Sequence, residues 1–481
     1  MYLGIDLGTS GLRALLTSPV GAPVAVAEAQ YSAQHPHPGW SEQDPADWIV
    51  ALDQAMAQLR DSPGFADIRG IAVAGHMHGA VLLDAADQVL RPCILWNDTR
   101  SASEAAELDA MPAVRELSGN IVFPGFTAPK LRWVQRHEPK IFDQVAKVLL
   151  PAGFLNLHLT GRHVADLSDS AGTSWLDVGA RAWSDRLLEA GHMRRDQMPD
   201  LAEGREAVGT LRPDLAQRWG LQPQVVVAAG AGDNAAAACG TGVMAPGQGF
   251  VSLGTSGVVL AARDGFHPDP ETAVHTFCHA LPQRWYQMGV MLSATDCMNW
   301  LSRISGQSPA AMTAPFSDGL RPPSEVRFLP YLSGERTPHN SAQLRGGFSG
   351  LATASDLQDL TAAVMTGVSF GLRDCLQALR ATGATIDHCL AIGGGSASPY
   401  WVQLLATVLN QPLQLPLHGE FGAAAGAARL ARLAHTGEPV DAVLTGPEIG
   451  QTVLPDPAQV AAYENAYQQF RAQVAAELQQ S

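Results

Sequence analysis

The chain has 481 residues, of which 46% are hydrophobic and 16% are charged. This length exceeds what one ordinary hydrophobic core holds, so we expect two or more globular domains. The formal net charge of −15 argues against nucleic acids and anionic membranes as partners, because both require basic patches. The six cysteines form no C-x-x-C pair. The chain shows no apparent secretory leader and no apolar run of membrane length. We therefore expect a cytoplasmic protein whose cysteines are free thiols.

A five-residue motif occurs twice, each time between two short apolar runs. Leu-Gly-Thr-Ser-Gly spans residues 7–11 and again residues 253–257. The pattern predicts a strand, a tight turn and a second strand at both places, and two copies indicate a duplicated unit. Because turn N–H groups and hydroxyls can donate to phosphate oxygens, both turns are candidate phosphate contacts. The candidate residues are Thr9, Ser10, Gly254, Thr255 and Ser256.

The first half predicts a strand meander followed by mixed strands and helices. A helix is expected from Pro45, with Asp44 as its N-cap, and another within residues 125–137. Residues 161–220 look loop-rich, and we interpret them as an elaboration on the first lobe. The expected strands are 1–5, 12–16, 24–31, 68–74, 81–84, 93–96, 145–150 and 225–229.

The second half repeats the meander over residues 249–262 and 272–280. The strongest helical period runs over residues 355–382 and is stopped by Gly383. Further helices are expected at 294–305 and 399–410, with an amphipathic one from about residue 457. We place the boundary near Ala245, which predicts lobes of 1–245 and 246–481.

Two aspartates follow predicted strands at glycine-rich turns. Asp6 adjoins the first phosphate turn, and a carboxylate beside phosphates is unfavourable without a cation, so it suggests Mg²⁺. The alternative is a strand-end aspartate bonded to turn amides. Asp233 lies at a helix start, where it would stay ionised and suit a base that takes a hydroxyl proton. An ordinary N-cap aspartate is an equal alternative.

Two other stretches have the composition of ligand sites. Gly394 and Gly395 lie in a strand-to-helix glycine turn that could hold a nucleotide, although neither G-x-G-x-x-G nor a P-loop occurs in the chain. A polar region with Met77, His78 and residues 96–98 suits a polyol, which offers hydroxyls and an apolar face. Two histidine pairs, His76 with His78 and His275 with His279, lack the third and fourth ligands of a zinc site.

These residues together resemble the FGGY carbohydrate kinases over nearly the whole chain, most closely the members that act on xylulose. The resemblance implies an α/β protein with two actin-like (ribonuclease H-like) lobes and a catalytic cleft between them. It also implies ATP-dependent phosphorylation of D-xylulose at its terminal hydroxyl. The matching stretches are 1–11, 40–45, 77–79, 95–98, 125–133 (GFTAPKLRW), 232–234, 253–257, 275–285, 330–340 and 393–396.

The resemblance also implies a role for each candidate residue. Asp233 matches the catalytic base and Asp6 the carboxylate linked to Mg²⁺, directly or through water. Two positions depart from the family pattern: His76 stands where relatives often carry Gln, and Thr366 where they carry an acidic residue. The remaining implied contacts are Met77 and His78 for the sugar, with Trp96, Asp98 and Asn234 as neighbours, and Thr9, Ser10, Gly254, Thr255, Ser256, Gly394 and Gly395 for ATP.

Three alternatives stay open at this point. A kinase of another polyol, such as ribulose, gluconate or glycerol, would share most of these motifs. An actin- or chaperone-like ATPase would not need the Met77-His78 region. A sugar-binding regulator without catalysis would not need both aspartates. The expected partners are the sugar and ATP, and a homodimer is left open.

Overall fold

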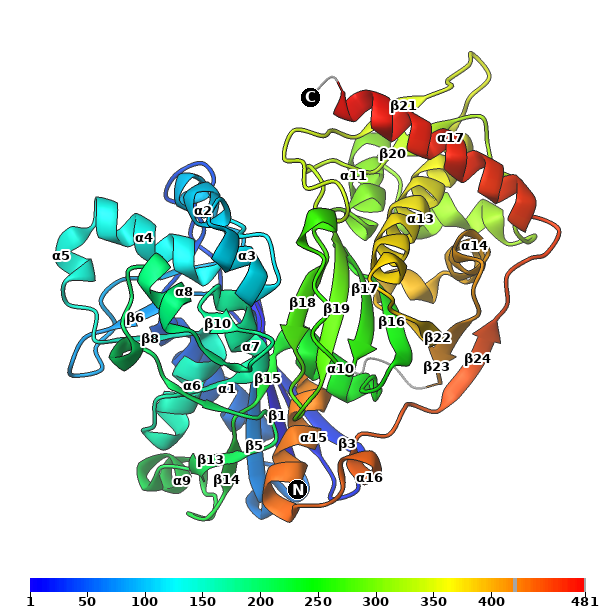
Figure 1. The fold of residues 1–481 in the computed structure, drawn as a ribbon. Helices are drawn as coiled ribbons and strands as arrows, with labels where there is room; N and C mark the ends of the chain where they lie inside the picture. The colour runs from blue at the N-terminus through cyan, green and yellow to red at the C-terminus, as the bar shows by residue number, and fades with distance from the viewer. Residues whose placement is uncertain (418–421, 480–481) are drawn as a thin grey trace.

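The protein has two α/β lobes, each built around a mixed sheet (Figure 1). The structure is a computed structural model that describes residues 1–417 and 422–479. No helix in these two ranges is both long and apolar enough to cross a membrane. All six cysteines are buried free thiols, as predicted.

The first sheet has the order β13-β14-β5-β1-β2-β3, and β15 also pairs with β5. β1 is antiparallel to β2 and parallel to β5. Every residue of β5 is buried, which explains its continuous apolar sequence. The strands are β1 (Tyr2–Leu7), β2 (Gly11–Thr17), β3 (Pro23–Gln30), β5 (Gly70–Gly75), β13 (Ala207–Thr210), β14 (Val226–Ala228) and β15 (Ala231–Gly232).

The second sheet has the order β18-β19-β17-β16-β22-β23-β24. β16 is antiparallel to β17 and parallel to β22, which repeats the pairing of β1 with β2 and β5. The two copies of the motif therefore close equivalent hairpins, and the predicted duplication is confirmed. The strands are β16 (Gly247–Leu253), β17 (Gly257–Arg263), β18 (His275–Cys278), β19 (Trp285–Met291), β22 (Ile386–Ile392), β23 (Leu413–Pro416) and β24 (Ile449–Val453).

Helices and short strands surround the first sheet. Asp44 caps α1 by accepting the N–H of Ala46 at 2.9 Å, as its position before Pro45 predicts. Residues 161–220 contain more structure than expected, but in elements too short to show a sequence period. The helices are α1 (Pro45–Leu59), α2 (Ala102–Asp109), α3 (Pro112–Ser118), α4 (Thr127–His137), α5 (Pro139–Phe142), α6 (Pro151–Thr160), α7 (Leu167–Ser170), α8 (Asp185–Ala190), α9 (Pro213–Trp219) and α10 (Asp233–Thr241). The short strands are β4 (Glu42–Gln43), β6 (Val81–Leu83), β7 (Cys93–Ile94), β8 (Lys147–Leu149), β9 (Val164–Asp166), β10 (Leu176–Asp177), β11 (Ala182–Trp183) and β12 (Asp200–Ala202).

The second half supplies the longest helix and the C-terminal helix. α13 begins after Asp356, which accepts two backbone N–H groups, and ends just before Gly383 at φ 80°. The buried residues of α17 recur at helical spacing, as predicted for an amphipathic helix. The helices are α11 (Thr295–Ser305), α12 (Pro309–Thr313), α13 (Leu357–Ala381), α14 (Pro399–Leu409), α15 (Ala423–Thr436), α16 (Val440–Val443) and α17 (Val460–Leu478), with the strands β20 (Arg327–Leu329) and β21 (Gly347–Ser349).

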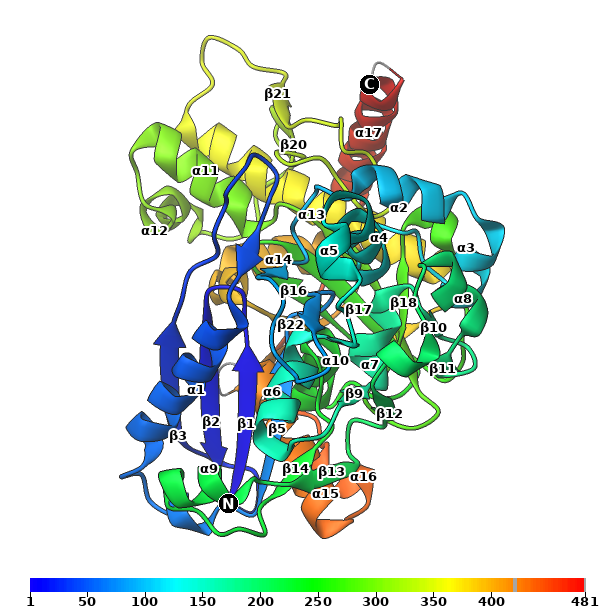
Figure 2. The same ribbon diagram turned by 90° about the vertical axis from the view of Figure 1, so that its left-hand side faces the viewer.

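One helix of the second half packs on the first sheet. α1 covers the face of that sheet formed by Leu3 and Ile5 (Figure 2), while α15 covers the opposite face, beside Tyr2. All strands of the first sheet precede residue 233, and those of the second follow residue 246. α15 comes later in the chain than both sets but lies against the first sheet (Figure 1). The position of the lobe boundary stays a prediction.

Candidate active site

A cavity of about 310 Å³ lies between the two lobes. Its volume is at the lower end of ligand sites, roughly 300–1,000 Å³. It joins most of the predicted sugar contacts to the second phosphate turn. Residues on its wall include Met77, His78, Trp96, Asp233 and Asn234 from the first half and Gly254, Ser256 and Arg336 from the second.

Asp233 presents a carboxylate to this cavity from the first residue of α10. Its Oδ1 accepts the backbone N–H of Asn234 at 2.7 Å and the Nδ2 group of Asn234 at 2.8 Å. Burial raises the pKa of Asp233 to about 6, although the bonds from Asn234 act in the opposite direction. The residue at the N-cap of α10 is Gly232, and Asp233 is the first helical residue, so Asp233 does not occupy the N-cap position. A carboxylate with one anchored oxygen and this pKa suits a general base.

Asp6 lies near the end of β1, close enough to Asp233 for their charges to interact. Burial raises the pKa of Asp6 to about 7, the charge of Asp233 raises it further, and Arg13 lowers it. The first turn closes on itself, because the N–H of Gly8 donates to the carbonyl of Gly11 at 2.9 Å. Two neighbouring carboxylates of this kind favour a cation between them and phosphate oxygens.

His78 is held in one orientation and one tautomer. Its backbone is left-handed, with φ 70°, and its ring stacks on Phe126 with centroids 4.4 Å apart. Nδ1 lies 2.7 Å from the carbonyl oxygen of Gly172, so Nδ1 carries the proton and donates. Burial lowers the pKa of His78 to about 3, and the ring is neutral at physiological pH. Nε2 is therefore an acceptor, which suits a sugar hydroxyl.

The region that contains Trp96 and Asp98 is fixed by the surrounding polar groups. Trp96, on the cavity wall, donates from Nε1 to Thr9 Oγ1 at 3.0 Å and so ties the wall to the first turn. Asp98 is buried, and its carboxylate accepts from the Arg100 guanidinium and from the N–H of Ser41. The structure therefore does not bring Asp98 to the cavity wall. The hydroxyl residues Ser10, Thr255 and Ser256 are exposed in their turns.

Sequence reasoning missed several residues of the site. Phe126 and Lys130 lie within the GFTAPKLRW stretch, but no role was assigned to either. Lys130 Nζ donates to the carbonyl of His78 at 2.7 Å and so supports the strained backbone there. Gln43 holds the first turn, because its Nε2 donates to the carbonyl of Thr9 at 2.6 Å. Arg336 lies in the matched stretch 330–340, and only its place on the cavity wall singles it out.

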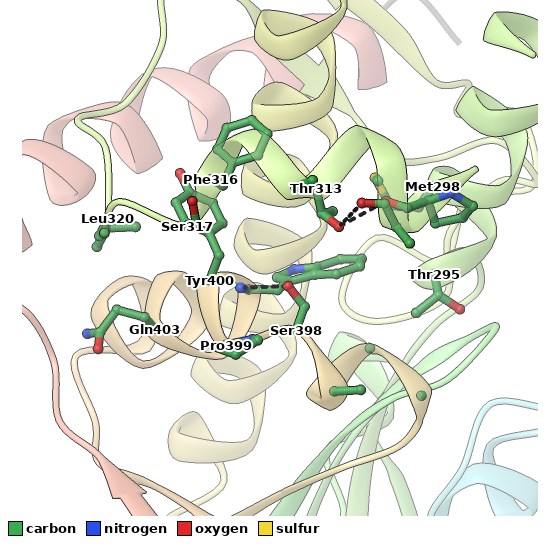
Figure 3. Close-up of a pocket in the computed structure, with 18 of the residues that line it drawn as sticks. Thr295, Met298, Thr313, Phe316, Ser317, Leu320, Ser398, Pro399, Tyr400 and Gln403 are labelled. Atoms are coloured by element: carbon green, nitrogen blue, oxygen red, sulfur yellow. Dashed lines mark hydrogen bonds between the residues drawn. The ribbon is translucent and has the colours of Figure 1, made fainter. Parts of the chain in front are cut away.

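A second and larger cavity, of about 910 Å³, lies between α11, α12 and α14 (Figure 3). Gly394 and Gly395 line it at the start of the short helix Gly394–Ala397. An added Cβ on Gly394 would meet nothing within 4 Å, so this backbone is open to a ligand. Aromatic and polar groups such as Phe316, Tyr400 and Ser398 face the same space, which suits a nucleotide.

The second phosphate turn connects the two cavities. Gly254 lines the smaller cavity, and its carbonyl accepts the N–H and the hydroxyl of Thr295 at 3.0 and 2.8 Å. Thr295 in turn lines the larger cavity. The turn therefore runs from the wall of the cavity at Asp233 to a residue that lines the larger cavity.

Comparisons with known proteins decide the family. The model of the FGGY family of carbohydrate kinases matches residues 1–240 with its N-terminal domain and residues 249–435 with its C-terminal domain. The chain belongs to the FGGY family of carbohydrate kinases.

Individual relatives of this FGGY kinase match over nearly the whole chain. It is 48% identical to the xylulose kinase of Escherichia coli (strain K12), with 98% of each chain covered. It is 47% identical to that of Klebsiella pneumoniae, with 96% of each covered. The crystal structure of a xyloylose kinase from Brucella ovis is 54% identical, covers 99% of each chain and has a TM-score of 0.97. The predicted actin-like, two-lobed α/β fold is thereby confirmed.

The two departures from the family pattern lie outside both cavities. His76 is buried against Trp48, with ring centroids 5.6 Å apart, and burial lowers the pKa of His76 to about 3. Thr366 lines a small space beside α17 in the second lobe. Neither side chain is on the wall of the cavity at Asp233 or of the larger cavity at Gly394.

Proposed function

We propose that this kinase transfers a phosphoryl group from ATP to the terminal hydroxyl of D-xylulose and forms D-xylulose 5-phosphate. The observation that carries the proposal is the single cavity shared by the carboxylate of Asp233, the neutral ring of His78 and the second phosphate turn. The full-length relatives named as xylulose kinases support the choice of sugar.

We infer that one particular oxygen of Asp233 takes the proton. Asn234 occupies Oδ1 of Asp233, so Oδ2 is the oxygen that takes the proton of the reacting hydroxyl. Phosphoryl transfer needs alignment and neutralisation of charge more than covalent help. The turn at Gly254 and Ser256 offers N–H and hydroxyl donors for the phosphate oxygens. Enclosure between the lobes limits the access of water, which would otherwise accept the phosphoryl group.

The residues also fit Mg²⁺, which neutralises phosphate charge in this class of reaction. Asp6 is a half-buried carboxylate whose pKa is raised to about 7, so a nearby cation would stabilise its ionised form. Within residues 1–417 and 422–479, no group of three or more His, Cys, Asp or Glu side chains could hold a metal ion. That suits Mg²⁺, which is usually bound through one or two carboxylates together with phosphates and water.

An assay of ADP release across a panel of sugars tests the substrate. We expect the highest kcat/KM with D-xylulose, because a site that hydrogen-bonds particular hydroxyls rejects analogues that lack them. Kinases of ribulose, gluconate or glycerol would share the base and the turns, so a clear preference for one of these sugars would refute the assignment. Rapid ATP hydrolysis that no sugar stimulates would instead indicate an actin- or chaperone-like ATPase.

A further inference from the structure

Arg336 reaches the sugar cavity from the loop that follows β20. Its guanidinium lies over the ring of Phe123, 4.6 Å from the centroid, and Nη1 lies 3.4 Å from Nε2 of His275. Phe123 belongs to the first half of the chain and also lines the cavity. The side chain is thus held against an aromatic ring on the cavity wall, and a guanidinium has further N–H donors beyond the one that faces His275.

The charge of Arg336 has no direct carboxylate partner. In the part of the chain that the structure describes, no acidic side chain lies within ion-pair distance of its guanidinium. The nearby Glu335 accepts instead from the backbone N–H groups of Arg336 and Leu292, at 2.7 and 3.0 Å. Burial lowers the pKa of Arg336 to about 10, so the group is still a cation at neutral pH. The charge of Glu335 raises the pKa of Arg336 without a direct hydrogen bond between the two side chains, so the guanidinium has N–H donors left for the oxygen atoms of a ligand.

Ring contacts place Arg336 at the histidine end of the cavity. Phe123, beneath the guanidinium, lies 5.6 Å from Phe126, and Phe126 stacks on His78. The charge of Arg336 also lowers the pKa of His78, whereas the pKa of Asp233 is shifted by burial and by Asn234. These contacts place Arg336 beside His78, and in the proposal this side of the cavity takes the part of the sugar remote from the reacting hydroxyl.

We propose that Arg336 is a specificity-determining residue that donates hydrogen bonds to the ketone oxygen of the sugar. This assignment rests on the proposed function, in which the terminal hydroxyl at the other end of a pentulose meets Asp233. A guanidinium can only donate, and a ketone oxygen can only accept. His78 Nε2, an acceptor, would take a neighbouring hydroxyl, so the two side chains read different groups. In the alditol, a hydroxyl on a tetrahedral carbon replaces the ketone; its oxygen can still accept, but it lies out of the plane of the former carbonyl and its lone pairs point in other directions.

The test compares D-xylulose with xylitol, its alditol, in wild type and Arg336→Met. Calorimetry measures the Kd of both polyols without nucleotide, and the ADP-release assay measures kcat and KM for D-xylulose. Hydrogen bonds to a charged group are worth about 10- to 100-fold in affinity. We expect Arg336→Met to weaken D-xylulose binding by that factor, to weaken xylitol binding less, and to leave the KM for ATP unchanged.

Two further variants keep the test decisive. Arg345→Met is the matched control, because Arg345 is exposed in the same loop region and donates to the carbonyls of Ala342 and Leu344. It should bind both polyols as wild type does. Arg336→Lys keeps the charge but loses the planar fork, and should show an intermediate loss of preference for the ketose. If thermal unfolding shows that Arg336→Met does not fold, the comparison of D-xylulose with xylitol is made in Arg336→Lys and decides the role of Arg336.

Several results would overturn the assignment. Unchanged D-xylulose binding in the folded variant would do so, as would equal losses for D-xylulose and xylitol. A lower kcat at unchanged sugar affinity would place Arg336 at the phosphoryl end instead. Failure of the wild-type enzyme to use D-xylulose would count against the proposed function. Normal wild-type turnover, with the preference for the ketose unaltered in the variants, would refute only the role of Arg336.

Discussion

At the residue scale, Asp233 is the side chain on which the proposed chemistry depends most. Asp233→Asn keeps the shape of the residue but cannot accept a proton. Positioned general bases contribute about 10²–10⁴ in rate, so kcat should fall by that factor, roughly 3–5 kcal/mol of barrier. Steady-state kinetics, with ATP binding and thermal unfolding as controls, measure the effect. A folded variant that keeps most of its turnover would remove Asp233 from the mechanism.

The raised pKa of Asp233 predicts how activity depends on pH. The base must be ionised, so kcat/KM should fall as the pH drops through about 6. The contribution of Asp233 to the free energy of unfolding depends on pH in the opposite direction. Since the pKa is raised above the ordinary aspartate value of 3.8, the carboxyl favours folding below that pH, and this contribution is lost as the pH rises through about 6.

Both signs can be checked with one pair of proteins. In Asp233→Asn the residual activity should lose the inflection near pH 6 and keep only the one that belongs to Asp6, whose pKa no longer feels the charge of Asp233. The variant should also be at least as stable as wild type at pH 8, because it no longer buries an ionised carboxylate. pH–rate profiles and thermal unfolding at pH 5 and 8 provide the data. A wild-type profile that stays flat through pH 6 would contradict the assignment of the base.

His78 provides a prediction about the sugar. His78→Ala removes the Nε2 acceptor and the ring stacked on Phe126. One neutral hydrogen bond is worth about 0.5–1.5 kcal/mol, and a stranded buried partner adds to that. We expect weaker sugar binding and nearly unchanged sugar-free ATP binding in calorimetry, with the exposed residue His388 changed to Ala as the control. An equal loss of ATP affinity would place His78 at the nucleotide or in the fold.

At the scale of elements, the contact between α15 and α10 depends on a glycine. A Cβ on Gly426 would lie 1.8 Å from the carbonyl oxygen of Ala236, a backbone atom that cannot yield alone. Gly426→Ala should therefore separate the helices and destabilise the protein by about 1–3 kcal/mol or more. Turnover should fall as well, because α10 begins at Asp233.

Urea unfolding compares this variant with Gly446→Ala as a matched control. An added Cβ on Gly446 would meet nothing within 4 Å. The control should unfold close to the wild-type midpoint. If the two variants were equally stable, α15 would not be tightly packed on α10 in solution.

At the scale of the whole molecule, the two cavities predict separate requirements for sugar and nucleotide. The cavity at Asp233, proposed for the sugar, is lined by protein groups. Mg²⁺, in contrast, is proposed to lie between Asp6 and the phosphates of ATP. Removal of Mg²⁺ with EDTA should therefore abolish turnover and leave D-xylulose binding unchanged. Calorimetry in EDTA measures D-xylulose binding. An activity assay before and after the addition of Mg²⁺ measures the loss and return of turnover. Full activity in EDTA, or loss of sugar binding, would refute the proposed role.

Features set by short-range rules could be predicted from sequence. The two hairpins, the Asp44 cap of α1 and the bounds of α13 all follow from turns, caps and periodicity within a few residues. The family resemblance extended this to the fold and to the main site residues. It also pointed to Asp98, whose carboxylate the structure finds already occupied by Arg100 and Ser41.

The rest was decided by contacts between distant parts of the chain. The tautomer of His78 depends on a carbonyl 94 positions away, and the place of Arg336 depends on Phe123 of the other half. α15, in a stretch for which no helix was predicted, packs on the first sheet because Gly4 and Gly70 let its backbone approach β1 and β5. Caps and periods report each residue's nearest neighbours along the chain, whereas burial, charge pairing and cavity walls depend on which surfaces meet when the chain folds.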